Sequence, residues 1–133
     1  MLGKAIYGRL QDVSGVTDLV EDRVYPDLAP GGVSQPYIVY ELDDIDHGHT
    51  YSGDSGVKSR RARVYCCSED RAARANLADA VISALDGSGT WGEIVIQGSF
   101  LEGRTDGVIV GDATEQQVTQ STELEFLVWY EES

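Results

Sequence analysis

Hydrophobic residues along this chain follow two spacings, one typical of helices and one typical of strands. Near the N-terminus Leu2, Ile6 and Leu10 are four residues apart, so they share one face of a helix. Residues 14–21 form a second, shorter apolar pattern, with Ser14 as the expected N-cap. The pattern therefore predicts two short helices before the first strand.

The strongest helical pattern begins after Ser68. We expect Ser68 to cap this helix and Gly87 to end it. Its apolar positions Leu77, Val81 and Leu85 alternate with many alanines, which gives a narrow face of small residues. Such a face can lie close to a sheet, so this helix is expected to cover one.

Four segments have the period of two that is typical of strands, and they are residues 37–45, 57–67, 93–101 and 119–130. The last strand is the most regular, with Leu124, Phe126 and Val128 on one face and Glu123 and Glu125 among those on the other. We expect the apolar face of this strand to be buried against the long helix.

The strand at residues 93–101 is less regular. Ile94, Ile96 and Phe100 are expected to point inward, while Gly98 interrupts the pattern and indicates a bulge. Long loops are predicted on either side of the sheet segments, at residues 23–36, 46–56 and 105–117. The last two exceed what a hairpin needs, so we expect them to contact partners.

The predicted order is helix, short helix, strand, strand, helix, strand, strand. It indicates an α+β fold, with an antiparallel or mixed sheet of about four strands built from two hairpins and with helices packed mainly on one face. At 133 residues the chain is expected to form one domain, residues 1–133.

Composition narrows the functional classes. No apolar run approaches the roughly 20 residues that span a bilayer, so no membrane association is expected. No apolar stretch follows Lys4, so we expect no export signal. The adjacent Cys66 and Cys67 would point to opposite faces of a strand, which predicts two reduced thiols rather than a disulfide. A reducing cytoplasm fits this prediction.

The formal net charge is −13, from 23 acidic and 10 basic residues. Binding to nucleic acid needs clustered cations, so a specific nucleic-acid-binding surface is not expected. Two interpretations remain open: the charge keeps the protein soluble, or it makes a surface that repels passing DNA.

The chain offers little catalytic chemistry. The segment Asp43 to His49 holds carboxylates and both histidines, but without a further histidine we interpret it as a solvated loop and predict no metal site. Nothing in the spacing pairs a histidine with Cys66 or Cys67 as a nucleophile, and no phosphate-binding glycine motif occurs. We therefore predict no enzyme activity and no cofactor.

Six charged residues are candidates for subunit contacts or exposed loops. We expect the arginines to pair with carboxylates within or between subunits, and the aspartates to be exposed; they are Arg60, Arg61, Arg63, Asp43, Asp44 and Asp46.

The sequence as a whole resembles the tail-terminator or tail-completion proteins of tailed bacteriophages. The resemblance covers nearly the whole chain and rests on structural segments rather than on a catalytic fingerprint: Asp22 to Pro26 (Asp-Arg-Val-Tyr-Pro), Pro36 to Tyr40 (Pro-Tyr-Ile-Val-Tyr), the alanine-rich Ala72 to Leu85 with Leu77-Ala78-Asp79-Ala80-Val81 at its centre, and Leu124 to Tyr130.

The resemblance implies a structural virion protein of the head-tail junction, made in the bacterial host cytoplasm. It would form a homohexameric ring that caps the tail tube, ends tail polymerisation and joins the head connector. Its partners would be its own copies, the tail-tube protein and the head-connector or stopper protein, with DNA passing through the ring. A head-closure or connector-adaptor protein, or a non-viral acidic adaptor domain, remains an alternative.

Overall fold

A computed structural model describes residues 2–27, 29, 34–42, 57–110 and 118–132. In this part of the chain there are three helices, which are α1 (Leu2–Asp12), α2 (Ser14–Val20) and α3 (Arg71–Leu85). There are six strands, which are β1 (Val24–Pro26), β2 (Tyr37–Leu42), β3 (Val57–Cys67), β4 (Gly87–Trp91), β5 (Ile94–Val110) and β6 (Val118–Glu132). The fold is α+β, as the sequence predicts.

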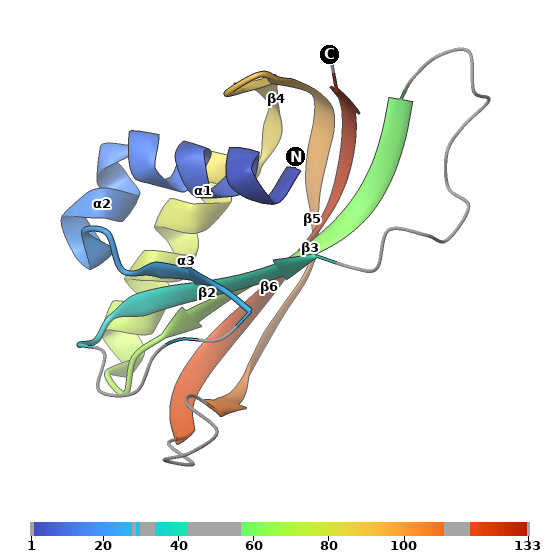
Figure 1. Cartoon of the computed structure of the whole chain (residues 1–133). Helices are drawn as coiled ribbons and strands as arrows, with labels where there is room; N and C mark the ends of the chain where they lie inside the picture. Colours follow the sequence, from blue (N-terminus) through green and yellow to red (C-terminus); the bar gives the residue numbers. More distant parts are fainter. Residues whose placement is uncertain (1, 28, 30–33, 43–56, 111–117, 133) are drawn as a thin grey trace.

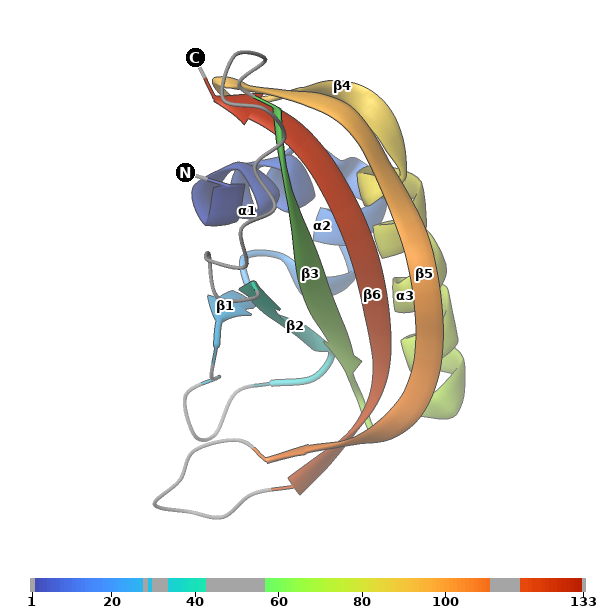
Figure 2. The ribbon, with the colours of Figure 1, turned by 90° about the vertical axis from the view of Figure 1, so that its right-hand side faces the viewer.

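The strands form one mixed sheet in the order β1-β2-β3-β6-β5-β4. Strand β1 runs parallel to β2, and every other neighbouring pair is antiparallel. All three helices lie on one side of this curved sheet (Figure 1). Seen from the other side, β3, β6 and β5 lie in front with the helices behind them (Figure 2). The prediction of helices mainly on one face is therefore confirmed.

The main core lies between the helices and the sheet. Leu124, Phe126 and Val128 of β6 are buried in the same cluster as Leu77 and Val81 of α3. From α1, Leu2, Ile6 and Leu10 join this cluster, as their four-residue spacing predicts. The strict alternation of β6 therefore marks the core face correctly.

The helix boundaries differ slightly from those expected. Asp70 caps α3, because its carboxylate accepts a hydrogen bond of 3.0 Å from the backbone N–H of Ala72. The hydroxyl of Ser68, the expected cap, instead accepts from the Asp70 N–H at 3.1 Å. Ser14 is the first residue of α2 and Val13 is its N-cap, so the Ser14 prediction is wrong.

The prediction of about four strands in two hairpins is corrected, because the described residues already form six strands. The two additional strands are short: β1 lies in the expected loop at residues 23–36, and β4 follows α3 directly. Gly87 ends the helix with a φ of 105°, which favours glycine, and then begins β4. Neither strand has an alternating apolar pattern of useful length, which is why the sequence did not reveal them.

Strand β5 is much longer than predicted and changes its inward face. Its register against β6 shifts between Ile96 and Gly98 and again between Leu101 and Gly103. The predicted bulge at Gly98 is confirmed, but it turns Phe100 outward, so the expectation that Phe100 is buried is wrong. The expected loop at residues 105–117 is strand as far as Val110, and residues 111–117 lie outside the described part of the chain.

Candidate functional site

The sheet face that the helices leave uncovered, here called the open face, carries a band of charged side chains. Strands β2, β3, β5 and β6 contribute to this band, which consists of Arg61, Arg63, Glu41, Glu102, Glu123 and Glu125. Four carboxylates thus share two guanidinium groups, which leaves the band with an excess of negative charge. We call these six residues the charged band.

Arg61 connects the two longest strands through the side chains on the open face. Its Nε lies 3.1 Å from a carboxylate oxygen of Glu102 on β5 and 3.2 Å from one of Glu125 on β6. Pairs this exposed contribute only about 0–1 kcal/mol each to folding. The arrangement therefore presents ordered charge at the surface more than it stabilises the sheet.

Arg63 connects β3 to both of its neighbouring strands, β2 and β6. Its guanidinium lies 3.8 Å from Glu41 on β2 and 3.7 and 3.8 Å from Glu123 and Glu125 on β6. Tyr65 donates a 2.9 Å hydrogen bond to Glu41. Burial raises the pKa of the Tyr65 hydroxyl, and the hydrogen bond and charge of Glu41 raise it further. The hydroxyl therefore stays protonated and anchors one end of the charged band.

An apolar patch adjoins the charged band toward the ends of β5 and β6 near Trp91. It consists of Val95 and Phe100 from β5 and Leu127 and Trp129 from β6, and Phe100 and Val95 are 53% and 42% exposed. The ring of Phe100 lies over Gly98, where an added Cβ would come within 2.8 Å of it. An exposed apolar patch beside ordered charges is typical of a protein contact surface.

A smaller apolar cluster occupies the other end of the open face. Ala29, Tyr37, Val39 and Cys67 are buried there, with Tyr25 and Tyr65 packed against them. The rings of Tyr25 and Tyr37 meet edge to face with centroids 6.4 Å apart. This cluster fixes β1 on the sheet rather than offering a binding surface.

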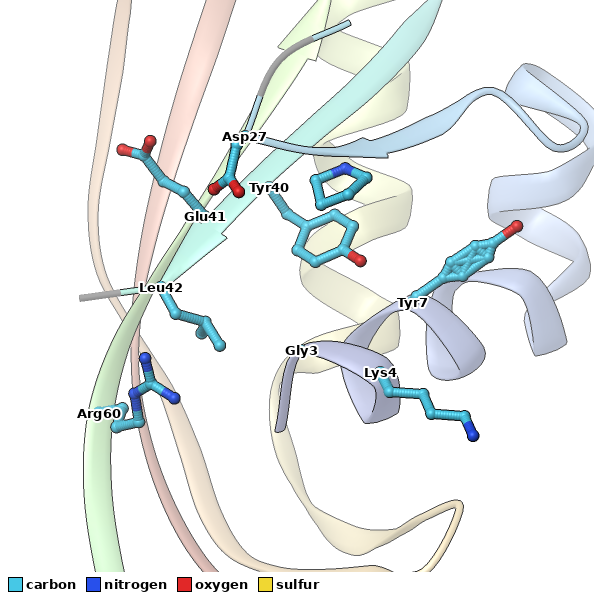
Figure 3. A pocket seen from close by; sticks show the side chains of 9 residues that line it. Gly3, Lys4, Tyr7, Asp27, Tyr40, Glu41, Leu42 and Arg60 are labelled. Atoms are coloured by element: carbon cyan, nitrogen blue, oxygen red, sulfur yellow. The ribbon is translucent and has the colours of Figure 1, made fainter. Parts of the chain in front are cut away.

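A cleft of about 650 Å³ lies between the start of α1 and the end of β2 (Figure 3). Tyr7 and Tyr40 line its apolar part, while Lys4, Asp27 and Arg60 bring charge to it. Burial raises the pKa of the Tyr40 hydroxyl, and Tyr7 and Asp27 add to the shift.

The structure separates the predicted charged candidates. Arg61 and Arg63 lie on the open face, paired with carboxylates of the same chain, whereas Arg60 lies on the other face and lines the cleft. Asp43, Asp44 and Asp46 lie outside the described residues. The exposure of these aspartates and the subunit contacts of the arginines stay predictions.

Glu102 was not predicted to belong to a functional site, and Phe100 was predicted to be buried rather than exposed. Both follow from the two bulges of β5, each of which has a glycine at its register shift, Gly98 in the first and Gly103 in the second. Glu123 and Glu125 were placed on the outer face correctly, but alternation alone could not show that β3 and its arginines lie beside them.

Comparison with known proteins gives the family. A model of the family described as tail completion protein gp17 matches residues 4–129. The chain belongs to this family. No curated protein matches the chain. A solved structure described as "Virion of native gene transfer agent (GTA) particle" contains a chain with 20% sequence identity and a TM-score of 0.68; the match covers 98% of this chain and 94% of that one. At this identity the likeness shows a shared fold.

As a member of the tail completion family, this protein is a structural component of a virion tail, as the resemblance implies. The described residues hold no group of three or more His, Cys, Asp or Glu side chains that could bind a metal ion. None of their helices is both long and apolar enough to cross a membrane.

Proposed function

We propose that this protein forms a ring at the end of a tail tube, where it ends tail assembly and joins the tail to the head connector. The observation that carries the proposal is the tail completion family match, which extends over residues 4–129 and so includes α2, α3, nearly all of α1 and almost all of the sheet. The ring is expected to be hexameric, as the sequence resemblance implies.

The open face supports this proposal. A completion protein must bind other proteins on fixed surfaces, and the charged band is held in place by four neighbouring strands. The apolar patch beside it offers Phe100 and Trp129, and aromatic residues are enriched where proteins make their strongest contacts. Copies in a ring would each use one surface against a different surface of the next copy.

Particles made without this protein should show its role. If it ends tail assembly, electron micrographs will show tails that are longer than normal and vary in length, with heads unattached. Supplying the protein in trans should restore uniform tails. Tails of normal length beside full, unjoined heads would instead indicate the connector-adaptor function, and normal particles would contradict both.

Self-association should strengthen as salt rises from low to moderate concentration. Each copy carries −13, and Arg61 and Arg63 already neutralise carboxylates of their own chain, so copies repel one another at low salt. At about 0.15 M salt the Debye length is about 8 Å, which screens most of this repulsion. Sedimentation velocity across a salt series would measure the effect. A steady loss of assembly with added salt would show that attractive ion pairs dominate between subunits.

A further inference from the structure

The free edge of β5 is the most unusual feature of the described sheet. Strand β4 pairs with β5 only as far as Ser99, whereas β6 pairs with its other side from Ile94 to Val110. Among the described residues, no strand pairs with the free side of β5 from Leu101 to Val108. Every second residue of this segment therefore directs its backbone N–H and C=O groups away from the sheet, which is the arrangement that accepts an added strand.

Two glycines on this segment have no explanation within the subunit. Gly103 and Gly107 both face the open side, and a Cβ at either position would meet nothing within 4 Å. Neither has a positive φ. Glycine within a strand costs about 0.5–1 kcal/mol relative to alanine. Gly103 follows a bulge, but Gly107 lies in regular register, so neither crowding nor strain within the chain requires glycine there.

The glycines also open a path from the free edge to the charged band. Gly103 lies opposite Glu125, and Thr105 lies opposite Glu123. With no side chain at Gly103, a long cationic side chain on an added strand could extend over β5 toward Glu125 and Glu102. The one basic residue of β5, Arg104, is turned to the helix side, where it binds Asp79 at 3.1 Å.

This chain has no described element that could supply such a strand. All ten basic residues lie within the described parts of the chain, and none of them belongs to the other edge strands, β1 and β4. The ten basic residues are Lys4, Arg9, Arg23, Lys58, Arg60, Arg61, Arg63, Arg71, Arg74 and Arg104. Those in strands belong to β3, which is paired on both sides, and to β5 itself. The occupant that complements the edge is therefore a different protein.

We propose that the free edge of β5 from Leu101 to Val108 binds an extended, lysine- or arginine-containing segment of another protein by strand addition. Backbone hydrogen bonds along the edge hold the segment, and its cations pass over Gly103 to the excess carboxylates of the charged band. This contact does not depend on ring formation, so either proposal can fail without the other.

The test uses the full chain and a nine-residue acetylated and amidated peptide of alternating lysine and valine. Alternate amides between Leu101 and Val108 should exchange hydrogen at least about tenfold more slowly with the peptide bound. A control peptide with glutamate in place of each lysine should not slow the exchange of these amides. A peptide N-methylated on its edge-facing residues should also give none, because it cannot donate the backbone hydrogen bonds. Equal protection by the N-methylated peptide, or protection confined to β1 or β4, would overturn the proposal.

Variants of the edge complete the test. Gly103→Val should lower the affinity for the lysine peptide by at least about fivefold, because its side chain blocks the path to Glu125. The thermal midpoint should stay unchanged or rise, since valine favours strands. Gly107→Val lies opposite Ser121, away from the carboxylates, and should lower the affinity less. Thr105→Val is the matched control, since it lies between the two glycines on the same face and adds no bulk. Equal affinity for the wild type and the Gly103→Val variant would contradict the proposal. If these amides exchange more slowly without any peptide as the protein concentration rises, the partner at the edge is a second copy of this chain, and the proposal is wrong.

Discussion

Replacing Phe126 with alanine should lower the free energy of unfolding by about 3–5 kcal/mol. Phe126 is fully buried and lies in the core cluster between β6 and the helices. Removing its ring leaves a cavity among closely packed side chains, so both transfer free energy and contacts are lost. Urea unfolding followed by tryptophan fluorescence would measure the change, because Trp91 and Trp129 report on the sheet.

The second phenylalanine is the matched control. Phe100 is 53% exposed on the open face, so Phe100→Ala should cost less than about 1 kcal/mol. The two variants make the same chemical change in one protein and differ mainly in burial. A loss from Phe126→Ala no larger than the loss from Phe100→Ala would contradict the assignment of the core face.

Stability should fall steeply in alkali because of two buried thiols. Burial raises the pKa of Cys66 and raises that of Cys67 to about 12, from an ordinary value of 9.0. Above pH 9 the unfolded chain releases these protons while the folded chain keeps them, so the stability present below pH 9 is lost as pH rises toward 12. Well above pH 9 each thiol would contribute a loss of about 1.4 kcal/mol per pH unit. Because the unfolded thiols are only half ionised at pH 9, the total loss between pH 8 and 10 is about 1.4 kcal/mol for each thiol, or roughly 3 kcal/mol for both.

Urea unfolding under reducing conditions at pH 8, 9 and 10 would measure this loss. The control is the double variant Cys66→Ala and Cys67→Ala. The two proteins are compared by how steeply the free energy of unfolding falls with pH, not by its absolute value. The double variant should keep only the smaller decline that comes from the hydroxyls of Tyr40 and Tyr65, whose pKa values are raised. The same slope in both proteins would show that the thiols do not titrate differently on folding.

Helix α1, strand β3 and strand β6 were predictable because each buries only one side in the main core. A fixed hydrophobic period then survives along the whole element, as in Leu124, Phe126 and Val128. Strand β5 was harder, since two bulges reverse its alternation and make Phe100 an outward residue. Strand β1 was missed because three residues are too short to show a period.

The candidate site was only partly predictable. The period of two puts Arg61 and Arg63, two residues apart, on one face of the strand at residues 57–67. It likewise puts Glu123 and Glu125 on one face of the strand at residues 119–130. The order of the strands depends on contacts between residues far apart in the sequence, such as Arg63 and Glu125. A local hydrophobic pattern gives no information about such contacts. The charged band therefore became visible only when the strand order was known.

From the sequence alone follow the α+β class, the core face of β6, the reduced cysteines and, by resemblance, the tail completion family. These conclusions depend on local periodicity, composition and characteristic segments, all of which can be recognised in the sequence without knowing the structure. Only the tertiary structure decided the six-strand order, the charged band and the free edge of β5. These arise where distant segments pair or stop pairing, because hydrogen bonds and ion pairs between strands depend on three-dimensional register and not on sequence spacing.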